Sequence, residues 1–245
     1  MLKLLIGLDP VHPKLERAVF LIINHKTNTA DFIYKLDIKN NHVIKGINLE
    51  GLRKIGEPLE IARKYYKDKI DEFFFLDCVA SLYRRNNLFD LVKECTEEIF
   101  VPLTIGGGIR SLKDIELCLK NGADRVAINS YATENPNFIS EAVTHFGSST
   151  IVSYIEAKKN LNGYEVYKYY GREPTGIDLI EWVKIVQDHN CGEIILTSID
   201  NDGIKKGFDF EMIEKVYKSI FVPIVVSGGC GKLEHINDLI KIYPK

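Results

Sequence analysis

Carboxylates and glycine runs follow short apolar segments at several places in this sequence. Asp37 and Glu156 each close such a segment, and the runs Gly106–Gly108 and Ser227–Gly229 follow two others. Two carboxylates that meet in one site can act as general acid and general base. Glycines ahead of a helix let backbone N–H groups approach an anion. The pattern therefore predicts acid–base chemistry on a phosphorylated substrate.

Short apolar segments alternate with helix-like stretches along most of the 245 residues. This alternation predicts a parallel sheet with helical crossovers. The expected strands are 32–38, 72–77, 101–105, 125–129, 150–156, 193–198 and 222–227, and the expected helices are 58–68, 88–98, 112–121, 136–146, 178–189, 209–219 and 233–242. No GxGxxG motif follows the first strand, which disfavours a dinucleotide-binding sheet. We expect an α/β fold of the (β/α)8 TIM-barrel type.

An internal repeat supports this architecture. Residues 100–120 align with 221–241 at an offset of 121, with 8 of 21 positions identical, and the same offset places 72–77 on 193–198. The repeat predicts two half-barrels of four βα units each. It also places the glycine runs on opposite halves, so two phosphate sites should face each other across the mouth. A substrate with a phosphate at each end would fit them.

The repeat also predicts that one strand is missing. An eighth strand is expected at 246–250, but the sequence ends at Lys245. The apolar run 17–24 is typical of a strand, yet the seven residues 25–31 are too few for a parallel crossover. We therefore expect an N-terminal extension over 1–30, carrying a hairpin partner or an extra element, and a barrel domain over 31–245. Whether the barrel closes stays open.

Functional residues of such barrels cluster at the C-terminal ends of the strands. Asp37 and Glu156 end the first and fifth strands, which oppose each other in an eight-stranded ring. Lys45, in the loop after the first strand, could reach over the mouth as a mobile cation. The remaining candidates at strand ends are Asp77, Gly107, Gly108, Asn129, Thr197, Ser198, Asp202, Gly203, Gly228 and Gly229.

Composition excludes several classes of function. The balance of 32 basic against 34 acidic residues offers no nucleic-acid or anionic-membrane surface. Five cysteines without a CxxC pair and six isolated histidines predict neither a metal site nor disulfides, so we expect reduced thiols, no metal and no cofactor. The N-terminal apolar run is too short for a signal peptide, and no stretch approaches the ~18 residues of a membrane span. A cytoplasmic location follows as an expectation.

Taken together, the motifs resemble one family over about residues 32–242. They are Leu36-Asp-Ile38, Val43-Ile-Lys-Gly-Ile-Asn48, Leu76-Asp77, Thr104-Ile-Gly-Gly-Gly-Ile-Arg110, Gly122-Ala-Asp-Arg-Val-Ala-Ile-Asn129, Phe146-Gly-Ser148, Ile155-Glu-Ala-Lys158, Gly192-Glu-Ile-Ile-Leu-Thr-Ser-Ile-Asp-Asn-Asp-Gly203 and Ser227-Gly-Gly229. The sequence resembles the cyclase subunit of imidazole glycerol phosphate synthase, from histidine biosynthesis. The isomerase of the same pathway shares the half-barrel repeat but is less similar in the Lys-Gly-Ile-Asn loop and in Thr-Ser-Ile-Asp-x-Asp-Gly.

The resemblance implies a carbon–nitrogen lyase and a partner. A glutaminase subunit docked at the N-terminal face would send ammonia through the barrel to phosphoribulosyl-formimino-aminoimidazole-carboxamide ribotide. The products would be imidazole glycerol phosphate and an aminoimidazole-carboxamide ribotide. Asp37 and Glu156 would be the catalytic acid and base, with Lys45 on a mobile loop. Gly107, Gly108 and Asn129 would hold one phosphate, and Asp202, Gly203, Gly228 and Gly229 the other; Glu72, Arg125 and Glu193 would form an ammonia gate.

Departures from the family pattern keep other functions open. Glu156 stands where the family has Asp, and Asp31 stands where the fourth gate residue is usually Arg, so Asp31 should repel Glu72 and Glu193. A carboxylate misplaced by about 1 Å can slow catalysis ~100-fold. One alternative is a cyclase-like subunit that channels ammonia to a sugar amidotransferase in surface-polysaccharide biosynthesis, which the loop 78–87 favours. The other is a non-catalytic barrel remnant, favoured by the missing strand.

Overall fold

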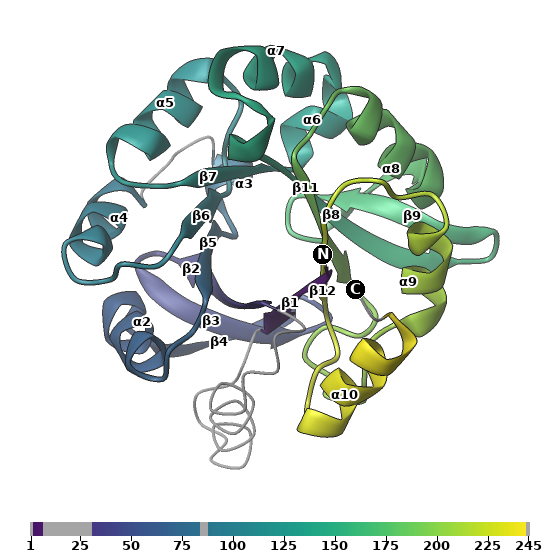
Figure 1. The fold of residues 1–245 in the computed structure, drawn as a ribbon, viewed down its shortest axis with the longest axis horizontal. Helices are drawn as coiled ribbons and strands as arrows, with labels where there is room; N and C mark the ends of the chain where they lie inside the picture. Colours follow the sequence, from purple (N-terminus) through teal and green to yellow (C-terminus); the bar gives the residue numbers. More distant parts are fainter. Residues whose placement is uncertain (1, 7–30, 84–87, 244–245) are drawn as a thin grey trace.

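Eight parallel strands form a closed ring in the computed structural model, which describes residues 2–6, 31–83 and 88–243. In order around the ring they are β1 (Leu2–Ile6), β2 (Asp31–Lys39), β5 (Glu72–Asp77), β6 (Leu103–Gly106), β7 (Arg125–Ile128), β8 (Ile151–Asn160), β11 (Glu193–Ser198) and β12 (Ile224–Ser227). Figure 1 shows the strands inside a ring of helices. The predicted (β/α)8 barrel is confirmed, and β2 lies opposite β8.

The ring is closed by the N-terminus of the chain. Strand β1 pairs in parallel with β12, with Leu2 opposite Ile224, and with β2, with Leu4 opposite Phe32. Among the described residues, the eighth strand is absent from its expected place after β12, as predicted, and a segment from the other end of the sequence fills the gap. The question of whether the barrel closes, which the sequence left open, is thereby answered. Of the extension expected over 1–30, the described part belongs to the barrel. The strand expected at 17–24 lies outside the described residues.

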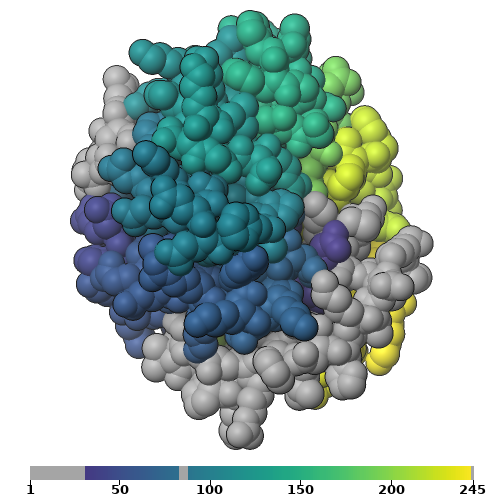
Figure 2. Space-filling view, turned by 60° about the vertical axis from the view of Figure 1, so that its left-hand side comes forward, coloured from purple at the N-terminus to yellow at the C-terminus, as the bar shows by residue number. Residues whose placement is uncertain are grey.

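In the part of the chain that the structure describes, seven amphipathic helices cover the outside of the strands. They are α2 (Pro58–Lys67), α4 (Phe89–Thr96), α5 (Leu112–Lys120), α7 (Asn137–Phe146), α8 (Leu179–Asp188), α9 (Phe210–Tyr217) and α10 (Leu233–Ile242), all close to their predicted bounds. Ser111, Asp178 and Asp209 accept hydrogen bonds from backbone N–H groups of the first turns of α5, α8 and α9. Such caps satisfy N–H groups that a helix leaves unpaired. Figure 2 shows the residues of this part of the chain, in blue and teal, as a continuous surface.

Two apolar cores result from the alternation of side chains along the strands. One lies between strands and helices and includes Tyr34, Phe73 and Trp182. The other fills the bore of the barrel, with Ile33 and Phe74 among its buried members. The bore is therefore packed with side chains, as in other barrels of this type.

Two hairpins extend from the opposing strands β2 and β8 at the C-terminal end of the barrel, and neither was predicted. Strands β3 (His42–Ile47) and β4 (Glu50–Gly56) continue antiparallel from β2. Strands β9 (Gly163–Lys168) and β10 (Glu173–Asp178) continue from β8 in the same way. Short helical segments α3 (Ala80–Tyr83), α6 (Ser130–Glu134) and η1 (Ser148–Thr150) complete the connections.

Candidate active site

Asp37 and Glu156 lie buried near the C-terminal ends of opposing strands, as predicted. Asp37 is 3% exposed and Glu156 is fully buried. Between them stand two residues that the sequence analysis missed, Lys35 and Tyr154. The Lys35 ammonium lies 2.9 Å from Oδ1 of Asp37 and donates a 3.0 Å hydrogen bond to the Tyr154 hydroxyl. We call Lys35, Asp37, Tyr154 and Glu156 the mouth cluster.

A signal for the two missed residues was present in the sequence. Lys35 precedes Asp37 by two positions, and Tyr154 precedes Glu156 by two. Side chains two apart on a strand lie on the same face. A residue at either position therefore enters the bore directly beneath the carboxylate.

The two carboxylates have different electrostatic surroundings. Burial raises the pKa of Glu156 to about 7, and Asp37 adds to this rise. Lys35, the N–H of Gly171 and the Tyr154 hydroxyl lower that pKa only in part. For Lys35, burial alone would lower the pKa, but Asp37 and the other acidic groups nearby hold it well above its usual value. At neutral pH the cluster therefore offers an ammonium paired with one carboxylate and a second carboxyl group that is close to half protonated.

Glu156 is held by two hydrogen bonds to one oxygen. Its Oε2 accepts from Nδ2 of Asn129 and from the backbone N–H of Gly171, each at 3.0 Å. Asn129 directly follows β7 and precedes α6, and Gly171 lies in the turn between β9 and β10. Neighbouring elements thus fix the orientation of this carboxyl group.

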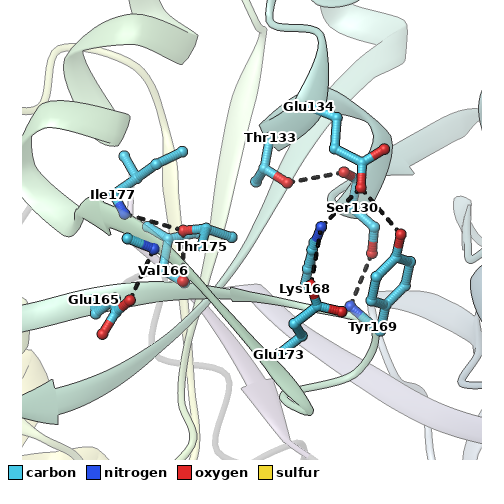
Figure 3. A network of polar contacts seen from close by, with 11 residues as sticks. Ser130, Thr133, Glu134, Glu165, Val166, Lys168, Tyr169, Glu173, Thr175 and Ile177 are labelled. Atoms are coloured by element: carbon cyan, nitrogen blue, oxygen red, sulfur yellow. Dashed lines mark hydrogen bonds and ion pairs between the residues drawn. The ribbon is translucent and has the colours of Figure 1, made fainter.

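The turn that carries Gly171 has a strained backbone. Tyr169, Tyr170 and Gly171 are consecutive residues with φ of 55°, 60° and 70°. A left-handed conformation costs a non-glycine residue about 1–2 kcal/mol. The strain is opposed by contacts that tie the turn to α6, where Ser130 Oγ accepts from the Tyr169 N–H and Glu134 accepts from the Tyr169 hydroxyl (Figure 3).

This turn determines the position of Tyr170. Its side chain is buried, and its ring centroid lies 5.6 Å from the Lys35 ammonium. Lys168, the last residue of β9 before this turn, also binds Glu134 (Figure 3). Tyr170 therefore closes the mouth cluster from above.

The first glycine loop has little free space beside it. The pocket lined by Gly107, Gly108, Asn129 and Glu156 has a volume of about 30 Å³, enough for one or two water molecules. The Gly108 N–H donates to Ser81 Oγ, and the Asn129 amide binds Glu156. A Cβ on Gly107 would lie 2.3 Å from the Asp77 carbonyl oxygen, so this glycine is needed for the turn itself.

The second glycine loop borders a cleft of about 680 Å³. Gly228, Gly229, Asp202 and Gly203 line it together with five cationic residues, which are Lys35, Lys45, Arg53, Lys54 and Lys205. Glu50 also contributes to the lining. Of the two predicted phosphate sites, this one has both the room and the positive charge for an anion.

Lys45 belongs to β3 and not to a loop, which corrects the prediction. Its ammonium lies 3.6 Å from Oδ1 of Asp202. The tip of the β3–β4 hairpin is fixed because Asn48 donates from its backbone to Asp202 and from its amide to the carbonyl oxygens of residues 199 and 200. The hairpin thus forms one wall of the cleft.

The three residues predicted to line the substrate site have different surroundings. Asp77 Oδ1 accepts from the N–H groups of residues 79 and 80. Ser198 Oγ donates to Asp209, the N-cap of α9. Thr197 lies beside Glu156 in the register of β11 with β8 and is buried. Asp77 and Ser198 thus hold local structure, and Thr197 borders the mouth cluster.

The predicted gate residues meet at the other end of the bore. Arg125 forms ion pairs with Glu72 and, at 2.8 Å, with Glu193. Thr104 donates a hydrogen bond to Glu72 at 3.1 Å. We call Glu72, Thr104, Arg125 and Glu193 the gate cluster. Asp31, which was expected to repel Glu72 and Glu193, is the first residue of β2 and pairs in register with residue 3 of β1.

The described part of the chain contains no group of three or more His, Cys, Asp or Glu side chains that could hold a metal ion. Its five cysteines are free thiols, four of them buried. Among the described helices, none is both long and apolar enough to span a membrane. The end of the loop 78–87 lies outside the described residues.

Comparison with known proteins agrees with this architecture. Residues 32–243 match the family model "Histidine biosynthesis protein", and the chain belongs to this family of barrel proteins. It is 50% identical over 206 residues to the imidazole glycerol phosphate synthase subunit HisF of Legionella pneumophila, which covers 84% of this chain and 97% of that protein. Proteins of the same name from Lactococcus lactis subsp. cremoris (47% over 219 residues; 89% and 83% covered) and Pyrococcus furiosus (44% over 210 residues; 86% and 84% covered) are also similar.

Proposed function

We propose that this chain is the cyclase subunit of imidazole glycerol phosphate synthase. It would use ammonia to convert phosphoribulosyl-formimino-aminoimidazole-carboxamide ribotide into imidazole glycerol phosphate and an aminoimidazole-carboxamide ribotide. The family and the names of its relatives support this proposal. The observation that carries it is the pair of buried carboxylates, Asp37 and Glu156, on opposing strands at the mouth of the barrel.

The unequal surroundings of the two carboxylates suggest their roles. When the surroundings of two titratable groups push their pKa values apart, one group can act as the acid and the other as the base. Glu156, with a pKa of about 7, is the proposed proton donor. Asp37, next to the Lys35 ammonium, is the proposed base. Lys45 and the cleft along Asp202, Gly203, Gly228 and Gly229 are proposed to bind one phosphate of the substrate.

The second phosphate is proposed to bind beside Gly107, Gly108 and Asn129. The pocket there is narrow, and Tyr170 is one of the residues that line it. A movement of Tyr170 away from the pocket would widen it for the phosphate. The strain in the turn that carries Tyr170 lowers the cost of such a movement.

The proposed source of ammonia is a glutaminase subunit docked at the N-terminal face, beside the gate cluster. Ammonia would then travel along the bore past Arg125. No cofactor and no nucleic acid enter this proposal. The free thiols suit a reducing compartment, and we place the reaction in the cytoplasm.

Turnover of the bisphosphorylated formimino substrate with ammonium chloride tests the proposal without a partner subunit. We expect the wild-type chain to form imidazole glycerol phosphate and Asp37→Asn to lose this activity. Glu156→Asp tests whether the longer side chain is tolerated. A folded wild-type chain that gives no product at any ammonium concentration contradicts the proposal.

A second candidate is an ammonia-channelling subunit for a sugar amidotransferase of surface-polysaccharide biosynthesis. The ion pair between Lys35 and Asp37 favours it, because a base engaged by a neighbouring ammonium is not free to take a proton. Product formed only by Lys35 or Glu156 variants would support this candidate. The third alternative, an open barrel remnant, loses its basis because β1 closes the ring.

A further inference from the structure

The ammonium group of Lys35 is enclosed on several sides within the bore. Asp37 lies 2.9 Å away on the same strand, and the Tyr154 hydroxyl accepts a hydrogen bond from across the barrel. The rings of Tyr154 and Tyr170 lie 5.3 and 5.6 Å from the ammonium nitrogen. We call this enclosure, formed by Asp37, Tyr154 and Tyr170, the cation cage.

The cation cage has the chemistry of a site for a small cation. A carboxylate supplies the opposite charge, and a hydroxyl oxygen accepts an N–H. The faces of aromatic rings attract a desolvated cation within about 6 Å of the ring centre. The space inside is occupied by one nitrogen with its protons, which is the size of an ammonium ion.

The two aromatic walls of the cage have contacts of their own besides those with Lys35. Tyr154 packs edge-on against Phe74, with ring centroids 5.4 Å apart. Tyr170 is placed by the strained turn that Ser130 and Glu134 tie to α6 (Figure 3). We therefore expect these two walls to stay in place when the lysine side chain is removed.

We propose that the cation cage is a binding site for ammonium and that Lys35 is its tethered occupant. Lys35 is thereby a specificity-determining residue, because it keeps free ammonium out of the position beside Asp37. The inference rests on the proposed function only in naming ammonia as the nitrogen that must reach this position. The cage itself follows from contacts that are independent of the reaction.

The cage also lies on the path that the proposed reaction requires. Lys35 and Tyr154 come from opposing strands, so their hydrogen bond crosses the bore between the gate cluster and the mouth. Ammonia that travels along the bore must displace the Lys35 ammonium to reach Asp37. Because the Lys35 ammonium occupies the cage, delivery of ammonia to Asp37 requires movement of the Lys35 side chain.

Thermal unfolding in different salts tests the site without any substrate. Lys35→Ala should be stabilised by ammonium or methylammonium chloride relative to sodium chloride at equal ionic strength. We expect about a tenfold shift of the unfolding equilibrium when the salt is at about ten times its dissociation constant, seen as a rise of a few degrees in Tm. The wild-type chain should not distinguish these salts.

Two variants serve as matched controls. Lys35→Ala/Asp37→Asn removes the carboxylate and should lose the response to ammonium. Lys218→Ala removes an exposed lysine paired with Glu214 and should behave like the wild-type chain. Equal responses of wild type, Lys35→Ala and the double variant would overturn the proposal.

If Lys35→Ala is obtained only in unfolded form, refolding replaces the melting experiment. Dilution from urea into ammonium chloride should restore the fold, whereas dilution into sodium chloride should not. Recovery that is the same in both salts, including no recovery in either, overturns the proposal.

Kinetics separate this inference from the proposed function. With the formimino substrate, Lys35→Ala should lower the KM for ammonium about tenfold, with a smaller change in kcat. Failure of the proposed function would appear as no product from any variant, while the salt-dependent stability of Lys35→Ala would remain. Turnover by Lys35→Ala with an unchanged KM for ammonium would contradict the assignment of Lys35.

Discussion

The bore of the barrel holds a cation beside acidic groups at both ends, but the two arrangements differ. In the gate cluster, Arg125 contacts two carboxylates directly, and Thr104 adds a hydrogen bond to one of them. In the mouth cluster, Lys35 contacts one carboxylate and a tyrosine hydroxyl, and the second carboxyl group has a pKa of about 7. The gate is thus fixed by charge, whereas the mouth retains a group that changes its charge near neutral pH.

The comparison teaches what each residue type is suited for. The planar guanidinium of Arg can bind two carboxylates at once and keeps its charge. The ammonium of Lys is a compact charge on a flexible stem. The two proposed roles, a seal at Arg125 and a displaceable occupant at Lys35, therefore match the two different cations of the same barrel.

Removal of the gate cation should have the largest effect on stability. Arg125→Met leaves Glu72 and Glu193 buried without their cation, and we expect a loss of about 3–5 kcal/mol in the free energy of unfolding. Urea titration measures it. Arg63→Met, which breaks an exposed ion pair with Glu98, should leave the midpoint almost unchanged. Similar urea midpoints for the two variants would show that the ion pairs of the gate cluster do not contribute to the stability of the fold.

The mouth cation should show strong coupling to its carboxylate. Lys35→Met leaves Asp37 as an uncompensated buried charge, which costs about 3 kcal/mol. Lys35→Met/Asp37→Asn removes both charges and should recover most of this loss. A double-mutant cycle in urea gives the coupling, and additive losses would mean that the ion pair is energetically unimportant.

Glu156 should make stability depend on pH in a defined window. Its pKa is near 4.5 in the unfolded chain and about 7 in the fold, so the folded state binds more protons between these values. Stability should therefore fall as pH rises from 4.5 to above 7, by ~3 kcal/mol at most. Glu156→Gln cannot titrate, and the difference between its unfolding curves and those of the wild type isolates this effect. A difference that stays constant with pH contradicts it.

Loss of one neutral hydrogen-bonding group should have the smallest effect. Thr104→Val removes the donor to Glu72 and should cost about 1 kcal/mol. Tyr154→Phe in the mouth cluster removes the acceptor for Lys35 at a similar cost. The distinguishing measurement is the pH profile of unfolding, which should shift for Tyr154→Phe and stay unchanged for Thr104→Val.

The sequence predicted those parts of the fold that depend on regular patterns. Apolar runs and amphipathic stretches located seven strands and seven helices, and the glycine repeat indicated two related halves. Among the hairpin strands, Glu50–Gly56 was missed because it has no buried residue. Strand β9 does have a buried face, formed by Tyr164 and Val166, and could have been found from this alternation. Strand β1 was missed because its partner β12 lies far away in the sequence, so that no local pattern indicates this pairing.

The candidate site was predicted unevenly for similar reasons. Asp37, Glu156 and the gate carboxylates follow from strand ends and the family pattern. Lys35 and Tyr154 could have been found from alternation alone, since each lies two residues before a predicted carboxylate. Tyr170 could not, because a left-handed backbone at a tyrosine contradicts the local preference and is imposed by contacts with α6.

Closure of the ring by β1 has a consequence for folding during synthesis of the chain on the ribosome. Leu2, Lys3 and Leu4 are made long before their partners in β12, Ile224 to Val226. Until β12 has been made, β1 can pair with β2, but its other edge has no partner strand, and an unpaired edge is a template for association with other chains. The ring can therefore close only after β12 has emerged, and a nascent chain halted before β12 is the form most exposed to aggregation.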